Sequence, residues 1–176
     1  MNYTSLESYV HKLLHSIQIT TPDEININKI AHNLEIELNY WNNPSEALIV
    51  GNEKYIFLDK RASRKEQVFK FGHELSHVLM DCGQQYGMPE LFREYQEWKA
   101  DNFAYHLCVP TFMLENMDIP FNIYKATDLV CKNFNVTIEV AVKRLKQFET
   151  KKQEDYFQSI AKKNCTEKDR ILNLWY

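Results

Sequence analysis

The chain has 176 residues and an apolar fraction of 44%, enough for one packed domain or for one domain with a small appendage. Its formal net charge of −3 and its isoelectric point near 6.1 give no general attraction to nucleic acid or to anionic lipid. No apolar run approaches the roughly eighteen residues of a membrane span, and the N-terminus lacks a signal-peptide pattern. We expect a cytoplasmic protein with reduced thiols, because its four cysteines are widely spaced: Cys82, Cys108, Cys131 and Cys165.

The first predicted elements are two helices and a small sheet. Apolar residues at helical spacing predict a helix over residues 5–17, and a second, short helix is expected over 27–33. Alternating or apolar runs predict strands at 35–41, 47–50 and 55–58, the last two joined as a hairpin. Strand 55–58 is a candidate edge strand for pairing with an extended substrate, and the alternative is a core strand that contacts no ligand.

A basic run and a helix start follow the sheet. Ser63 and Glu66 have the spacing of a capping box, which predicts that a helix begins here, and Gly83 is expected to end it. The basic run is either a solvated loop or a docking patch for an acidic partner, and both readings stay open. It contains Lys60, Arg61, Arg64 and Lys65.

The most informative motif is His73-Glu74-x-x-His77. Within a helix the two histidines lie one turn apart on the same face, so both imidazoles can reach one zinc ion. Glu74 projects about 100° away from His73 around the helix axis, which places it beside the ion without ligating it. A carboxylate in that position can act as a general base toward water.

A further helix, predicted from near Pro89 to Pro110, can supply the third protein ligand that a catalytic zinc site requires. Glu97 and Asp101 are four residues apart and therefore share one face of this helix. One carboxylate would bind zinc, and the other would orient a ligand histidine through its second ring nitrogen. The spacing alone does not choose between them.

The chain from Thr111 onward is predicted to be helical again. Residues 126–134 and 138–148 form a helix-turn-helix-like pair, with Thr137 as the N-cap of the second helix. The pair is a DNA reader, a helical lid or a partner-docking module, and the acidic overall charge favours the last two. The apolar end, 171–176, is expected to fold back on the body or to engage a partner.

Two motifs together resemble a known family. His-Glu-x-x-His, followed about twenty residues later by Glu97-x-x-Ala-x-x-Phe-Ala104, looks like the ImmA/IrrE metallopeptidases. The resemblance covers roughly residues 26–146 in the order of elements. Ser76, where many members carry glycine, is a small departure.

The resemblance implies a Zn²⁺ ion bound by His73, His77 and Glu97, with Glu74 as the catalytic base. Asp101 would then brace one of the histidines, for which we choose His73. The implied fold class is α+β. A zincin-like metallopeptidase core over residues 1–112 would carry a small antiparallel sheet packed on the motif helix, and a helical substrate-docking region would follow over 113–176.

The family also implies a function. We expect a zinc-dependent endopeptidase that cleaves a helix-turn-helix transcriptional repressor at one site, as an anti-repressor of a prophage or mobile element. Neither a membrane nor direct nucleic-acid binding is expected. The alternative is a non-proteolytic regulator that binds a repressor and holds a structural or degenerate zinc site.

Overall fold

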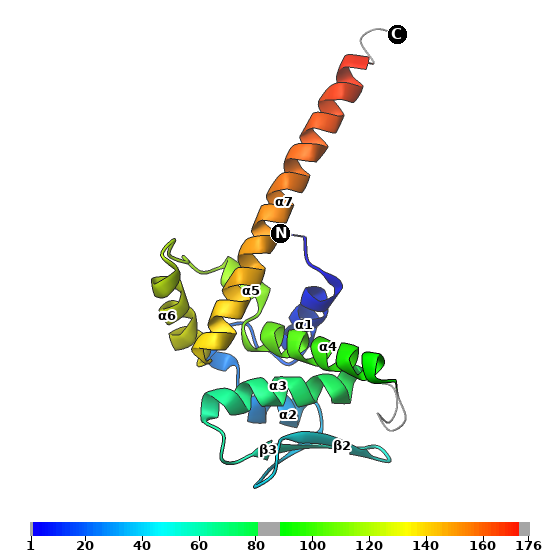
Figure 1. The fold of residues 1–176 in the computed structure, drawn as a ribbon, viewed down its shortest axis with the longest axis vertical. Helices are drawn as coiled ribbons and strands as arrows, with labels where there is room; N and C mark the ends of the chain where they lie inside the picture. Colours follow the sequence, from blue (N-terminus) through cyan, green and yellow to red (C-terminus); the bar gives the residue numbers. More distant parts are fainter. Residues whose placement is uncertain (1, 81–88, 173–176) are drawn as a thin grey trace.

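The computed structural model describes the backbone of residues 2–80 and 89–172, and the side chains of residues 2–80 and 89–161. The elements in chain order are α1 (Ser5–Ser16), the 3-10 turn η1 (Pro22–Glu24), α2 (Ile27–Asn33), β1 (Ile36–Trp41), β2 (Glu46–Val50), β3 (Glu53–Asp59), α3 (Arg64–Met80), α4 (Glu90–Cys108), α5 (Thr111–Glu115), α6 (Ile123–Phe134) and α7 (Ile138–Leu172). Figure 1 shows their arrangement.

Helix α3 begins where the sequence predicts. The backbone N–H of Ser63 donates to Glu66 Oε2 at 2.7 Å, and the N–H of Glu66 lies 3.4 Å from Ser63 Oγ, which forms the predicted capping box. The predicted stop at Gly83 lies outside the described residues. The α+β fold class, with a small sheet against the motif helix, is confirmed.

The sheet itself differs from the prediction in two respects. Its strand order is β1-β3-β2, with β2 antiparallel and β1 parallel to β3, so the sheet is mixed and not antiparallel throughout. The expected edge strand 55–58 belongs to β3, which is the central strand. A tight turn at Gly51, with φ of +63°, places β2 on one side of β3 and leaves the other side to β1. The two edge strands of the sheet are therefore β1 and β2, and β2 is the edge on the hairpin side.

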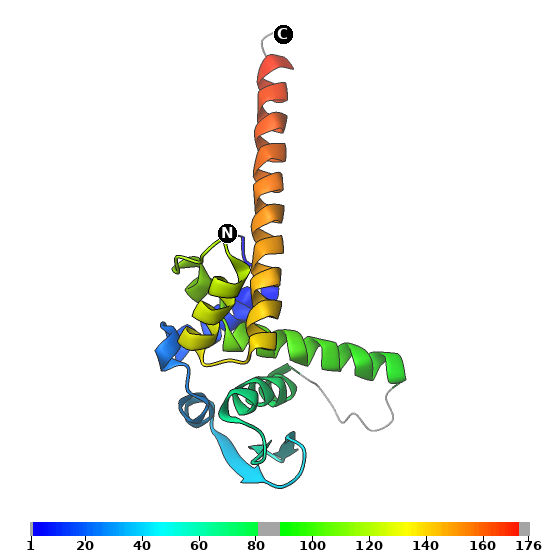
Figure 2. The same cartoon turned by 60° about the vertical axis from the view of Figure 1, so that its left-hand side comes forward.

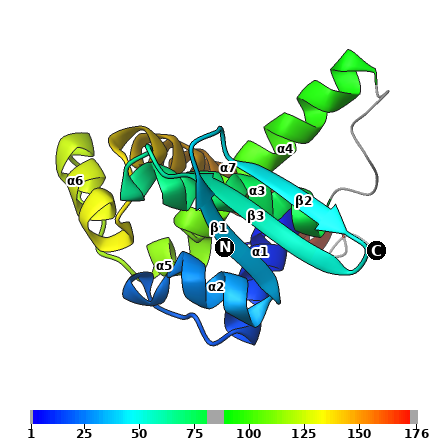
Figure 3. The same cartoon turned by 90° about the horizontal axis from the view of Figure 1, so that it is seen from below.

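Helix α3 lies between the sheet and α4, as Figures 1 and 3 show. The two helices approach closely at Gly72, where an added Cβ would stand 3.0 Å from the Cα of Ala104. Glycine at this point lets the backbones come together, and this brings the functional faces of α3 and α4 within reach of each other.

One hydrophobic core runs through the whole body. It includes Phe71 and Phe103 of α3 and α4 together with Val130, Leu145 and Phe148 of α6 and α7. Core residues thus lie on both sides of the expected division at residue 112/113, which stays a prediction. The first part of α7 contributes to this core.

Beyond the core, α7 continues as one straight helix that projects away from the body (Figures 1 and 2). The sequence analysis ended this helix at residue 148, and the structure extends it to Leu172. Its projecting part exposes Tyr156, Phe157 and Ile160. Among the helices that the structure describes, none has the length and apolarity needed to cross a bilayer.

A buried polar network fixes α7 to the start of the chain. The Arg144 side chain, 1% exposed, donates through Nε to Val109 O and through Nη2 to Thr111 Oγ1, each at 3.0 Å. Glu7 accepts from Thr111 Oγ1 at 2.7 Å and lies 2.8 Å from Lys151 Nζ. Buried charges are stable only when they are paired and hydrogen-bonded, and this network satisfies both conditions.

Candidate metal centre

The two motif histidines face the same point in space. His73 and His77 lie one turn apart on α3, and their Nε2 atoms are 3.2 Å apart. Both side chains are mostly buried, with exposed fractions of 13% and 16%. Two unprotonated ring nitrogens at this distance would repel each other in the absence of a shared proton or cation, so the pair is well suited to a metal ion.

Helix α4 brings a carboxylate to the same point. Glu97 Oε2 lies 3.2 Å from His73 Nε2, and Glu97 Oε1 lies 3.7 Å from His77 Nε2. In a tetrahedral zinc site with bonds of about 2.0–2.1 Å, neighbouring donor atoms stand about 3.3 Å apart. Donor atoms of all three residues lie within 4.8 Å of one another. The donor set and its spacing therefore fit Zn²⁺.

The two carboxylates of α4 have different partners. Asp101 Oδ1 lies 2.8 Å from His73 Nδ1, on the side of the ring opposite to Nε2. If Nδ1 carries the proton and donates it to Asp101, the lone pair of Nε2 is left to point at the metal position. The structure thus places Glu97 beside the Nε2 atoms of His73 and His77. Asp101 lies behind the ring of His73, the histidine that the sequence analysis expects it to brace.

Glu74 lies inside the protein beside this set. Its side chain is 7% exposed, and burial raises the pKa of its carboxyl group, against the opposing electrostatic effects of His73, His77 and Lys70. A carboxylate with a raised pKa both accepts and returns a proton more readily near neutral pH. The arrangement provides an acid–base group at the edge of the donor set.

Lys70 is a neighbour of Glu74 that the sequence analysis did not single out. It precedes Glu74 by one helical turn and acts on the charge of that carboxylate. The spacing i, i+4 on one helix face was the available signal. Its positive charge favours the ionised form of Glu74, which is the form that accepts a proton.

The family model of the IrrE N-terminal-like domain, Peptidase_M78, matches residues 35–146. The chain belongs to this family. The Peptidase_M78 match contains the histidine motif and Glu97, and it supports a protease-like or regulatory role for the chain. The resemblance inferred from the two motifs is confirmed.

Similar proteins agree with this family assignment. The chain is 42% identical over 153 residues to the phage-like element PBSX protein XkdA of Bacillus subtilis strain 168, a match that covers 87% of this chain and 77% of that protein. It is 37% identical over 147 residues to the uncharacterized protein YqaB of the same strain, covering 82% and 86%. A solved Mycobacterium tuberculosis transcriptional regulator matches with a TM-score of 0.58 at 12% identity, over 77% of this chain and 44% of the other, which concerns the fold alone.

Proposed function

We propose that this Peptidase_M78 chain is a zinc-dependent endopeptidase that cleaves a helix-turn-helix transcriptional repressor. The observation that carries the proposal is the convergence of His73, His77 and Glu97 on one point next to the buried carboxylate of Glu74. A purely structural zinc site has no need of a carboxylate at that position, whereas peptide hydrolysis requires a general base there.

Each residue has a separate task in the proposed reaction. A zinc ion in this donor set supplies the Lewis acidity that polarises a peptide carbonyl and makes water acidic near neutral pH. Glu74 accepts the proton from the attacking water and later donates it to the amine that leaves. Asp101 holds the His73 ring in one orientation and one tautomer.

Strand β2 is the proposed binding edge for the substrate main chain. It lies beside α3, pairs with β3 alone among the described strands, and exposes Leu48, Ile49 and Val50 by 47%, 49% and 55%. An extended peptide can add to such an edge through main-chain hydrogen bonds. These bonds do not depend on the side chains, so peptides of many sequences can bind in this way. Selectivity for one repressor then has to come from another surface.

The proposed repressor substrate has two supports. The ImmA/IrrE resemblance implies an anti-repressor, and the similar XkdA protein carries the name of a phage-like element. The projecting part of α7 is the proposed docking surface, because it lies outside the core and exposes Tyr156 and Phe157. A large exposed aromatic pair on a helix suits a contact with another protein.

Ending the chain after Lys152 should separate docking from catalysis. Arg144, Phe148 and Lys151 remain, so we expect the truncated protein to fold and to retain zinc. Cleavage of the folded repressor should fall by at least about tenfold, because hot-spot aromatics typically contribute that much to binding. Cleavage of a short unfolded peptide should be unchanged. Undiminished cleavage of the folded repressor would exclude α7 as the docking surface.

Metal content is the direct test of the proposed centre. Wild-type protein should carry about one zinc per chain by native mass spectrometry, and Glu97→Ala should lose it because two histidines alone bind weakly. Glu90→Ala, which removes a carboxylate from the first turn of the same helix, is the matched control and should keep the metal. Absence of zinc from the wild type after reloading would contradict the enzyme and favour a non-proteolytic regulator.

A further inference from the structure

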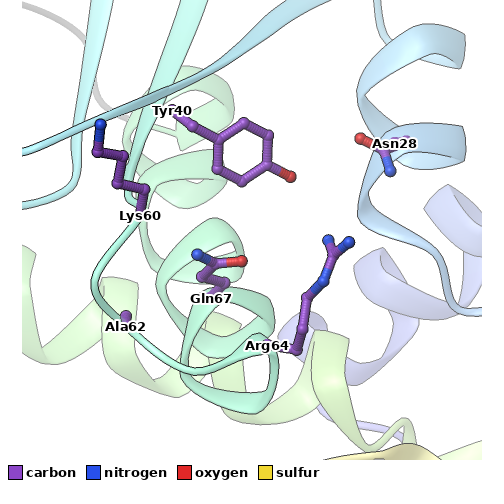
Figure 4. Close-up of a pocket in the computed structure, with 6 residues that line it drawn as sticks. All are labelled: Asn28, Tyr40, Lys60, Ala62, Arg64 and Gln67. Carbon is purple, nitrogen blue, oxygen red and sulfur yellow. The ribbon is translucent and has the colours of Figure 1, made fainter.

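The basic run at residues 60–65 divides into two parts in the structure. Arg61 forms a two-point ion pair with Asp59, with both nitrogen–oxygen distances at 2.8 Å. Lys60 and Arg64 instead line a cavity of about 510 Å³, together with Asn28, Tyr40, Ala62 and Gln67. Figure 4 shows these side chains. If the basic run binds a partner, the binding residues are therefore those that line this cavity.

The cavity is separate from the metal centre. Its walls come from α2, the end of β1, the segment between β3 and α3, and the start of α3, and none of the three candidate metal-donor residues lines it. Arg64 precedes His73 by nine residues, which corresponds to about 13 Å along a helix. A ligand in the cavity would therefore not touch the catalytic residues.

The lining is positively charged and contains no carboxylate. Lys60 and Arg64 are exposed, and within the described residues neither side chain has an ion-pair or hydrogen-bond partner. In Figure 4 the Arg64 guanidinium is directed into the space between Tyr40 and Asn28, whereas the Lys60 ammonium is directed away from it, so Arg64 is the cation that marks a local site for an anion. The guanidinium group of Arg64 suits a phosphate better than a point charge does, since it offers two parallel donors.

Neutral polar groups share the same space. In Figure 4 the hydroxyl of Tyr40 and the carboxamide of Asn28 are directed toward the region that the Arg64 guanidinium enters. Gln67 is 6% exposed, and its Nε2 donates to the backbone oxygen of Asp59 at 3.1 Å. This bond fixes the carboxamide so that its oxygen is turned toward Asn28 and Arg64 (Figure 4), where it can accept from a ligand hydroxyl.

We propose that this cavity binds a phosphorylated small molecule of the nucleotide class. The phosphate contacts Arg64, the hydroxyl of Tyr40 and the amide of Asn28, and a sugar hydroxyl donates to Gln67 Oε1. The Tyr40 ring, 42% exposed, offers a surface for a planar base. The volume lies within the range of about 300–1,000 Å³ typical of small-molecule sites. An acidic peptide would use the cations but would leave the ring and the oriented carboxamide oxygen without a role.

Calorimetric titration of the full chain with the ribonucleoside 5′-monophosphates tests the proposal. At least one should bind the wild type, and the corresponding unphosphorylated nucleoside and inorganic phosphate should each bind at least about tenfold more weakly. Arg64→Gln should weaken nucleotide binding by at least about tenfold, the effect of losing a hydrogen bond between charged groups. Tyr40→Phe, which removes one hydroxyl, should weaken it less.

Lys65→Gln is the matched control, because it removes the next positive charge on α3 without touching the cavity. It should leave binding unchanged within about twofold, and circular dichroism should show all variants folded. If Arg64→Gln and Lys65→Gln weaken nucleotide binding equally, the effect comes from the overall charge of the protein, and the proposed site is wrong. The nucleotide assignment is also overturned if no monophosphate binds at millimolar concentration, if inorganic phosphate binds as tightly, or if only an acidic peptide binds.

Discussion

Replacing Glu74 with glutamine is expected to reduce repressor cleavage by about 10³-fold while the zinc content stays at the wild-type level. Glutamine has nearly the same shape as glutamate, but it cannot accept the proton of the attacking water, and general bases typically contribute factors of 10²–10⁴. Because Glu74 lies beside the donor set and is not among its members, the metal should remain bound.

The measurement compares new N-termini in host cells that produce either the wild type or Glu74→Gln. A repressor fragment present only with the wild type identifies both the substrate and the scissile bond, and purified proteins then give the rate. Glu66→Gln is the matched control: it changes an exposed carboxylate of the same helix, and glutamine preserves the capping box with Ser63. Its cleavage rate should equal that of the wild type.

The same pair of variants separates the enzyme from a regulatory binder. If the protein acts only by binding a repressor, Glu74→Gln should keep the full biological effect, because neither the metal nor the docking surface changes. Loss of cleavage together with retained binding of the intact repressor is the expected result. Retained derepression in cells without any cleaved fragment would contradict the peptidase proposal.

The candidate metal centre can be predicted from the sequence because its geometry is mostly local. The positions of His73 and His77 follow from helical periodicity alone, once α3 is recognised. The choice between Glu97 and Asp101 is not local, because it depends on how α4 crosses α3. That crossing is set by the close contact between Gly72 and Ala104, which spacing within one helix does not reveal.

The sheet and α7 show two other limits of sequence patterns. Alternation predicts that β1, β2 and β3 are strands, but it carries no information on which side of β3 the first strand takes. The sequence pattern predicts too short a helix α7, because residues after 148 lack a continuous apolar stripe. They are rich in lysine, glutamate and glutamine, which favour helices by propensity even without a packed face.

Replacing Glu7 with glutamine is expected to lower the free energy of unfolding by about 3 kcal/mol at pH 7. Burial alone would raise the pKa of Glu7, but hydrogen bonds from Lys151, Thr111 and Thr4 outweigh it and lower the pKa to about 2, against 4.5 for an ordinary glutamate. A difference of this size corresponds to about 3 kcal/mol of stability. Glutamine would also leave the buried charge of Arg144 without its nearby carboxylate.

The pH dependence of this loss has a definite sign. The pKa of Glu7 is lower in the folded state than in the unfolded state, so its contribution is complete above about pH 4.5 and declines as the pH falls toward 2. Urea unfolding should therefore show a difference between wild type and Glu7→Gln of about 3 kcal/mol at pH 7 and about 2 kcal/mol at pH 3.5.

Glu149→Gln is the control for the general effect of one lost negative charge. It changes an exposed carboxylate of α7 close to Lys151, and surface substitutions of this kind usually alter stability by less than about 0.5 kcal/mol. The free energy of unfolding of Glu7→Gln could also differ from the wild-type value by this small amount, or by an amount that grows as the pH falls. Either result would show that Glu7 does not secure α7 to the N-terminal helix. A large loss of stability that shrinks at acid pH is the expected result. It would show that the Glu7–Lys151 ion pair holds α7, and with it the proposed docking part of that helix, in position.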